Sequence, residues 1–244
     1  MAKTAYNILE DIFTNQINVL NIAVPLTPLD HKAAKELCIE NNYDVHLVRE
    51  QEREDLQVYE KNTDSIRPLH DSEVISESTP LIEVVDLLCK KEQVFIKVKR
   101  NVTHLVTRSD LDTIPVRIWL YGMISIFEFE LKERINQLSL KWEETLTSDR
   151  LAKAKELYVL KQSKNEEISL LGCIQLGDVG TIIFKSWGHF NDFFPSGYSK
   201  KIIQSSFNKI NLLRDVLAHG QKLQMEWPEI HRLMQTISYS LNKF

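Results

Sequence analysis

An arginine and a histidine near the C-terminus are the two residues best suited to chemistry. They lie in the segment Leu213–Gly220, which reads LRDVLAHG. A guanidinium group can hold a phosphate through paired hydrogen bonds, and an imidazole can transfer protons near neutral pH. The pair Arg214 and His219 is therefore the candidate for a site that combines an anion-binding group with a proton-transfer group.

The helix that carries this pair decides whether the two side chains can meet. We expect it to run from Ser199, its predicted N-cap, to about His219, with Gly220 as a left-handed stop. Residues five apart diverge by about 140° on a regular helix. Arg214 and His219 can therefore converge only if the helix ends or unwinds between them, or if a second subunit supplies a partner.

Basic and aromatic residues precede the pair and suggest a platform for phosphates and stacked bases. Phosphates would meet lysines on the same helix, and bases would stack on aromatic rings in the loop before it. The residues concerned are Lys200, Lys201 and Lys209, with Tyr198, Phe193 and Phe194. Packing of the aromatic residues beneath the helices is the other interpretation of that loop. We also expect Asp178 to cap a helix or to pair with Arg214.

From Thr113 onward the sequence predicts helices only. They are expected over about 115–141, 149–161 with Ser148 as N-cap, 169–185, 199–219 and from Pro228 onward. The first carries apolar residues every three or four positions, as an amphipathic helix requires. Its longest apolar run, Ile118–Phe127, is too short to cross a bilayer and suits a buried helix. These features predict a small helical bundle over 113–244.

The first part of the chain, over 1–112, contains two similar segments about 50 residues apart. Each opens with Thr-Pro-Leu, at 27–29 and at 79–81, and continues into a helical stretch. Short strands are expected to follow, over 45–48 and 56–59 in the first copy and over 94–98 and 102–107 in the second. The prolines suit a first helical turn. Chance similarity within a small α/β domain is the alternative interpretation.

The second copy ends in Thr107-Arg108-Ser109-Asp110, at the start of a predicted helix. A carboxylate can accept hydrogen bonds from ribose hydroxyls, and a threonine hydroxyl at a helix start can help to hold a phosphate. The simpler interpretation is that Ser109 and Asp110 cap the helix. In the first copy, Tyr59 and Asn62 stand near the equivalent positions, so one nucleotide site at most is expected.

Composition and charge narrow the class of protein. The chain has 244 residues and a formal net charge of −4, which is unlike a general polyanion binder. Residues 1–112 carry a net charge of −7 and residues 113–244 one of +3, which suggests two domains with different partners. The three cysteines are odd in number and form no CxxC pair, which argues against a zinc site and for a reducing compartment. Without a secretory signal at the N-terminus, we expect a cytoplasmic protein without a membrane span.

Residues 20–112 resemble a tandem pair of CBS domains, chiefly through the Thr-x-x-Asp of the second copy. This resemblance implies a cleft in which Thr107, Ser109 and Asp110 bind an adenosine nucleotide as a regulatory ligand. Residues 113–244 resemble a HEPN domain, through the apolar first helix with Glu128 and Glu130 and the Arg-x4-His ending. One branch of that superfamily continues the motif as His-x-Tyr, which Gln221 does not support.

Together the two resemblances imply an α+β chain in which CBS-like β-α-β-β repeats precede an all-α HEPN-like bundle. The implied activity is a metal-independent endoribonuclease that works as a homodimer and is regulated by the adenosine nucleotide. Arg214 and His219 would be catalytic, with Asp215 orienting the arginine, and no cofactor would be needed for catalysis. The alternative is a non-catalytic protein that senses a nucleotide and mediates dimerisation or partner docking.

Overall fold

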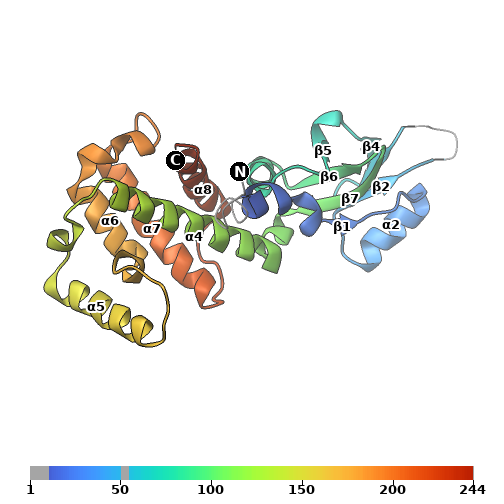
Figure 1. Cartoon of the computed structure of the whole chain (residues 1–244). Helices are drawn as coiled ribbons and strands as arrows, with labels where there is room; N and C mark the ends of the chain where they lie inside the picture. The colour runs from blue at the N-terminus through green and yellow to red at the C-terminus, as the bar shows by residue number, and fades with distance from the viewer. Residues whose placement is uncertain (1–10, 51–54, 244) are drawn as a thin grey trace. The chain divides into compact units, whose positions relative to one another are not determined.

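The computed structural model describes residues 11–50 and 55–243, which divide into two compact units (Figure 1). One unit, Asn15–Val116, contains the strands, and the other joins the described residues 117–243 to residues 11–14. The predicted order of a sheet region followed by helices is therefore confirmed. Most of the N-terminal stretch in which we found no signal sequence lies outside the described residues.

The N-terminal unit is built on two separate sheets. Its strands are β1 (Val24–Pro25), β2 (Val45–Val48), β3 (Gln57–Glu60), β4 (Ser65–Pro68), β5 (Val74–Ser76), β6 (Gln93–Val98) and β7 (Asn101–Thr107). Four of them form a sheet in the order β1-β7-β6-β5, and the other three form one in the order β2-β3-β4. Only β5 and β6 pair in parallel, and the remaining neighbours are antiparallel. The first strand of the unit thus closes onto its last.

Both copies of the predicted repeat have a helix followed by an antiparallel strand pair. Helix α2 (His31–Glu40) leads into β2 and β3, and α3 (Leu81–Lys90) leads into β6 and β7. The expectation that the prolines lie in the first helical turn is wrong. Pro80 occupies the extended position before α3, and the N-cap of α2 is Asp30, which accepts a hydrogen bond from the Ala33 N–H at 2.9 Å. The residue before a helix has extended backbone angles, which proline tolerates well.

Strand β2 is buried on both faces because its alternate residues join two different clusters. Val45 and Leu47 pack with Val58, Phe95 and Val102 in the core of the unit. Val48 instead joins Ala34, Cys38 and Tyr59, which seal α2 against β2 and β3. This arrangement explains why the sequence of β2 reads as an apolar run rather than as an alternating one.

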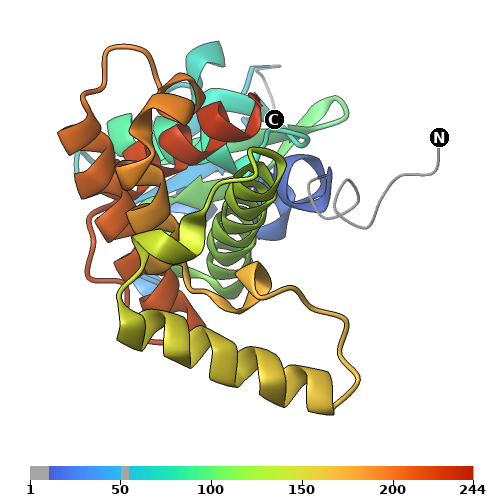
Figure 2. The same cartoon turned by 60° about the vertical axis from the view of Figure 1, so that its left-hand side comes forward.

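The helical unit contains α5 (Ser148–Ser163), α6 (Leu176–Lys185), α7 (Lys200–Ala218), α8 (Trp227–Leu241) and most of α4 (Ile114–Gln137) (Figures 1 and 2). The predicted start of α6 at residue 169 is wrong, because residues 171–173 form a separate 3-10 turn. Helix α4 ends four residues earlier than predicted, before Ser139 adopts a positive φ of 48°. The N-cap of α5 is Thr147 rather than Ser148. In the described part of the chain, no helix is both long and apolar enough to cross a membrane.

Aromatic rings hold three helices of this unit together. The ring of Phe207 on α7 lies 5.8 Å from that of Phe127 on α4 and 5.7 Å from that of Phe184 on α6, measured between centroids. Gly180 makes room for this cluster, because a Cβ atom there would lie 2.9 Å from the Phe207 ring. Most of the apolar run 118–127 is buried, as the sequence predicted, including Trp119, Leu120, Met123, Ile124 and Phe127.

Candidate active site

The candidate residues lie at the C-terminal end of α7, where local chemistry ends the helix. Ser199 caps its start by accepting a hydrogen bond from the Ile202 N–H, as predicted. At the other end, Gly220 has a φ of 63°, and the N–H groups of Gly220 and Gln221 donate to the carbonyls of Leu217 and Val216. These two hydrogen bonds form a Schellman motif, which confirms that Gly220 ends the helix as predicted.

The structure does not bring Arg214 and His219 together within one chain. The helix stays regular up to its last residue, and the His219 N–H donates to the Asp215 carbonyl at 3.1 Å. Of the two routes by which the pair could converge, an end or unwinding of the helix between them is therefore absent, because the Schellman motif forms only after His219. Their side chains diverge as on a regular helix, and no hydrogen bond joins them among the contacts of the described residues. His219 is exposed to solvent.

Arg214 is half-buried and lies against acidic side chains. Its Nε is 3.7 Å from Oε2 of Glu128 on α4, and its Nη1 is 3.6 Å from Oδ1 of Asp215. Glu128 also accepts a hydrogen bond at 2.7 Å from Lys132, whose Nζ donates to the Ile174 carbonyl at 2.8 Å. The side chain of Arg214 is 26% exposed and that of Glu128 is 15% exposed. An arginine whose Nε faces a carboxylate still has other N–H donors with which it can bind an anion.

Glu128 contacts the candidate arginine, but the sequence analysis assigned it no role in the site. It was noted only as part of the resemblance of the first helix. The available signal was a carboxylate between two phenylalanines in an apolar helix, since such a buried charge requires a partner. Lys132, four residues on, is a partner that the sequence does show, whereas Arg214 lies 86 residues away.

The predicted pairing of Asp178 with Arg214 is wrong, and the predicted capping role is right. Both oxygens of this buried carboxylate accept hydrogen bonds from Arg150 on α5, at 2.7 and 2.6 Å. Asp178 also accepts the Gln175 N–H at the start of α6, at 3.1 Å. Its hydrogen bonds to Arg150 raise the pKa of that guanidinium. Asp178 therefore ties α5 to α6 and has no part at the end of α7.

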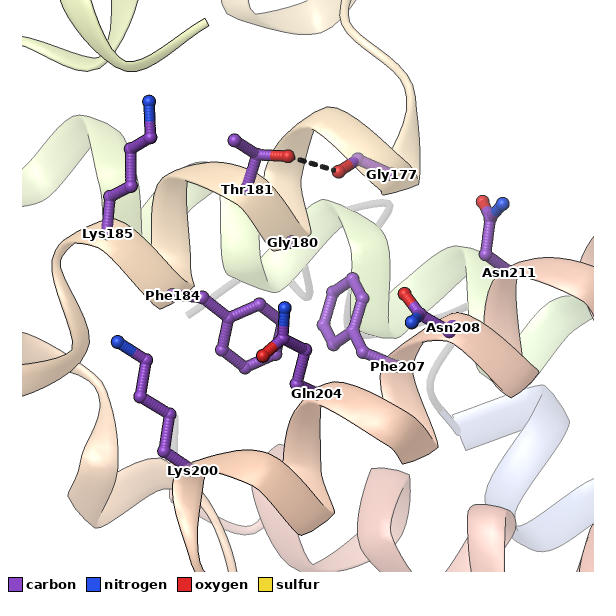
Figure 3. A pocket seen from close by; sticks show the side chains of 10 residues that line it. All are labelled: Gly177, Gly180, Thr181, Phe184, Lys185, Lys200, Gln204, Phe207, Asn208 and Asn211. Carbon is purple, nitrogen blue, oxygen red and sulfur yellow. Dashed lines mark hydrogen bonds between the residues drawn. The ribbon is translucent and has the colours of Figure 1, made fainter.

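The four predicted RNA contacts are distributed over different surfaces. Tyr198 and Lys209 line a hollow of about 250 Å³ between α7 and α8, where Lys209 is paired with Glu229. Lys200 lines a different pocket, between α6 and α7 (Figure 3). Lys201 is exposed beside it and lines neither. A single platform of lysines and tyrosine is therefore not assembled.

The aromatic residues of the preceding loop take the packing role. Phe194 is buried and stacks on Trp187 with ring centroids 5.6 Å apart. The guanidinium carbon of Arg134 lies 4.9 Å from the centroid of the Phe193 ring, in a cation–π contact. Neither ring is presented as a stacking surface for a base.

In the N-terminal unit, the Thr-x-x-Asp residues form a local cap. Oδ2 of Asp110 accepts hydrogen bonds from the N–H and the hydroxyl of Thr107, at 2.7 and 2.9 Å. The hydroxyls of Thr107 and Ser109 are also bonded, at 2.6 Å. These residues cap a 3-10 turn, Arg108–Asp112, rather than the predicted helix. Oδ1 of Asp110 takes no hydrogen bond from the residues that the structure describes.

No group of three or more His, Cys, Asp and Glu side chains in the described ranges 11–50 and 55–243 is arranged to hold a metal ion. Comparison of the chain with protein-family models, with curated proteins and with solved structures finds no match. Functional assignment therefore rests on the site itself.

Proposed function

We propose that the chain is a metal-independent endoribonuclease whose active site is built from Arg214 and His219. One observation carries the proposal. A solvent-exposed imidazole ends the same helix on which a half-buried arginine is held by Glu128. The first group can exchange protons with substrate and water, and the second presents donors to an anion at a fixed place.

The reaction needs no nucleophile from the protein, because RNA supplies its own 2′-hydroxyl. The 2′-oxygen attacks the adjacent phosphorus, the bond from phosphorus to O5′ breaks, and a 2′,3′-cyclic phosphate and a 5′-hydroxyl result. His219 accepts the proton from the 2′-hydroxyl or delivers one to the departing O5′. Arg214 hydrogen-bonds the phosphate oxygens, on which charge increases in the transition state. Asp215, beside Arg214, helps to orient it.

A homodimer would supply what one chain lacks. Since Arg214 and His219 diverge on the helix, we propose that each site combines the arginine of one chain with the histidine of its partner. Mixing the inactive variants Arg214→Ala and His219→Ala tests this directly. With random exchange in a two-fold dimer, half of the dimers are mixed and each has one intact site, so about a quarter of the parental activity returns. Sites built within single chains would recover nothing.

We also propose that an adenosine nucleotide binds near Asp110 and regulates the enzyme. Support comes from the exposed hydroxyl of Ser109 and from Oδ1 of Asp110, an acceptor suited to a ribose hydroxyl. Thermal shift with ATP, ADP and AMP should detect binding that Asp110→Asn abolishes and that Asp71→Asn, an exposed residue of the same unit, leaves intact. Equal shifts in both variants would exclude this site.

The activity itself is tested by incubating the purified chain with RNA of mixed sequence in EDTA. Cleavage should occur, and Arg214→Ala and His219→Ala should each reduce it at least 100-fold, a typical effect of losing an acid–base or charge-stabilising group. His189→Ala is the matched control, because His189 is also an exposed histidine of the helical unit. Cleavage that survives both substitutions would contradict the assignment. A folded protein that binds a nucleotide and leaves RNA intact would favour a non-catalytic sensor.

A further inference from the structure

A pocket of the helical unit lies between α6 and α7, and it contains none of the residues assigned to catalysis. Its volume is about 370 Å³, within the range of small-ligand sites. Figure 3 shows Lys185 and Lys200 at one end and Asn211 at the other, with the rings of Phe184 and Phe207 between them. The pocket thus has a charged end, an apolar floor and a polar end.

The positive charge of the residues that line the pocket favours an anionic ligand. Two lysines border the pocket, and no Asp or Glu is among the described residues that line it. Lys185 already donates to the Thr145 carbonyl at 2.6 Å, while Lys200 forms no ion pair with any described residue. The hollow between α7 and α8 is less basic, because Glu229 neutralises Lys209 there and Arg232 is the one further charged residue among the described ones that line it, against two lysines in the α6–α7 pocket. A phosphate is therefore better matched to the α6–α7 pocket.

Three side-chain amides add a different kind of recognition. Gln204, Asn208 and Asn211 follow one another along the pocket side of α7. Each amide offers donors and an acceptor, the pattern needed to pair with the edge of an unstacked base. Single-stranded RNA is recognised in this way, through base edges together with apolar contact to the base. The pocket therefore matches one nucleotide of such a strand: the lysines suit its phosphate, the amides suit the edge of its base, and the two phenylalanine rings suit the face of the base.

The same face of α7 continues toward the catalytic end. Asp215 follows Asn211 by four residues, so the two lie one above the other on the helix surface. Asn208 and His219 are eleven residues apart, which corresponds to about 16 Å along the helix axis. A few nucleotides of an extended strand cover that length.

We infer that the α6–α7 pocket binds one nucleotide of a single-stranded RNA substrate, a few nucleotides away from the phosphate that is cleaved at Arg214 and His219. This inference rests on the proposed function and adds the substrate class to it: RNA that is unpaired beside the cleaved bond. Duplex RNA keeps its bases stacked and cannot place one in the pocket.

Two matched pairs of substitutions test the pocket. A Cβ atom at Gly177 meets nothing within 4 Å, so Gly177→Leu fills the pocket edge without a backbone clash, and Gly188→Leu is the same change in an equally open position outside it. Lys200→Glu reverses the charge at the phosphate end, and Lys153→Glu makes the same change at an exposed lysine of α5 that lines neither pocket.

The measurement is fluorescence anisotropy with a labelled RNA single strand of about 12 nucleotides. All four variants are made in a His219→Ala background, so that the probe stays intact during the titration. We expect Gly177→Leu and Lys200→Glu to raise Kd about tenfold and their controls to change it less than twofold. A duplex of the same sequence should bind more weakly than the single strand. Circular dichroism verifies that each variant is folded.

The outcomes separate the inference from the proposed function. If the parental chain cleaves RNA while each pocket variant binds like its control, the pocket assignment is overturned and the nuclease proposal stands. Equal affinity for single strand and duplex would also overturn the inference. If the His219→Ala chain binds no RNA and the parental chain cleaves none, both are overturned together.

Discussion

Replacing Glu128 by Gln tests how much the contact with α4 stabilises the position of Arg214, the proposed catalytic arginine. At 3.7 Å, the attraction between Glu128 and Arg214 is about 4 kcal/mol for an effective permittivity near 20. Lys132 already neutralises part of the same carboxylate, and both partners keep some contact with water, so a net coupling of about 1 kcal/mol is expected. The Gln carbonyl oxygen can still accept the Lys132 hydrogen bond, but the loss of its charge assistance adds about 1 kcal/mol to the destabilisation by Glu128→Gln.

Urea unfolding followed by tryptophan fluorescence measures this coupling in the helical unit. All four tryptophans, Trp119, Trp142, Trp187 and Trp227, lie in that unit. We expect Glu128→Gln to lower the midpoint by about 1 M urea, which corresponds to about 2 kcal/mol.

Glu133→Gln, an exposed change on the same helix, is the control and should have little effect. A double-mutant cycle with Arg214→Gln should return the coupling of about 1 kcal/mol. A coupling indistinguishable from zero would refute the claim that Glu128 positions the arginine.

Three further predictions concern other parts of the chain. Gly220→Ala should destabilise the helical unit by about 1 kcal/mol in the same urea assay, and Gly220→Asn by less, because the cost arises from the positive φ alone. Burial by itself acts to raise the pKa of Glu73, but the hydrogen bonds from Arg67 and from the His70 N–H, together with the charge of Arg67, outweigh it and leave the pKa below its ordinary value. Its contribution to stability is therefore present above the ordinary carboxyl pKa and is lost as pH falls through the lowered value, and hydrogen exchange of β4 should show a smaller acid-induced loss in Glu73→Gln. Burial raises the pKa of the Cys38 and Cys89 thiols, so both should react slowly with iodoacetamide at pH 7 in the native protein, Cys89 faster than the fully buried Cys38; equal rates in native and urea-unfolded protein would contradict this.

Local signals were sufficient to predict the helix that carries the site. Ser199 and Gly220 act on their own backbone neighbours, and both ends of α7 lie within one residue of the prediction. The early start predicted for α6 was wrong because the apolar residues before it fit a helical pattern, while the chain there forms a 3-10 turn and Gln175 begins a new helix.

Contacts between distant segments were not predictable in this way. Arg150 and Arg214 lie at similar sequence distances from Asp178. Asp178 pairs with Arg150 because α5 packs against α6, and the sequence does not show that packing. The α6–α7 pocket depends on Gly180, which lets the ring of Phe207 approach, and the sequence shows only a glycine in a helix. The amides along α7 had a visible helical spacing, but nothing in the sequence indicated that a pocket lies beside them.

The chemical identity of the RNA ends tests the central claim most directly. A labelled RNA is incubated with the protein in EDTA, and its products are compared with those from a strand that carries 2′-deoxyribose at the cleaved position. We predict a 2′,3′-cyclic phosphate and a 5′-hydroxyl, no cleavage at the deoxy position, and no products from His219→Ala. Cleavage at the deoxy position, or unchanged cleavage by His219→Ala, would contradict the central claim.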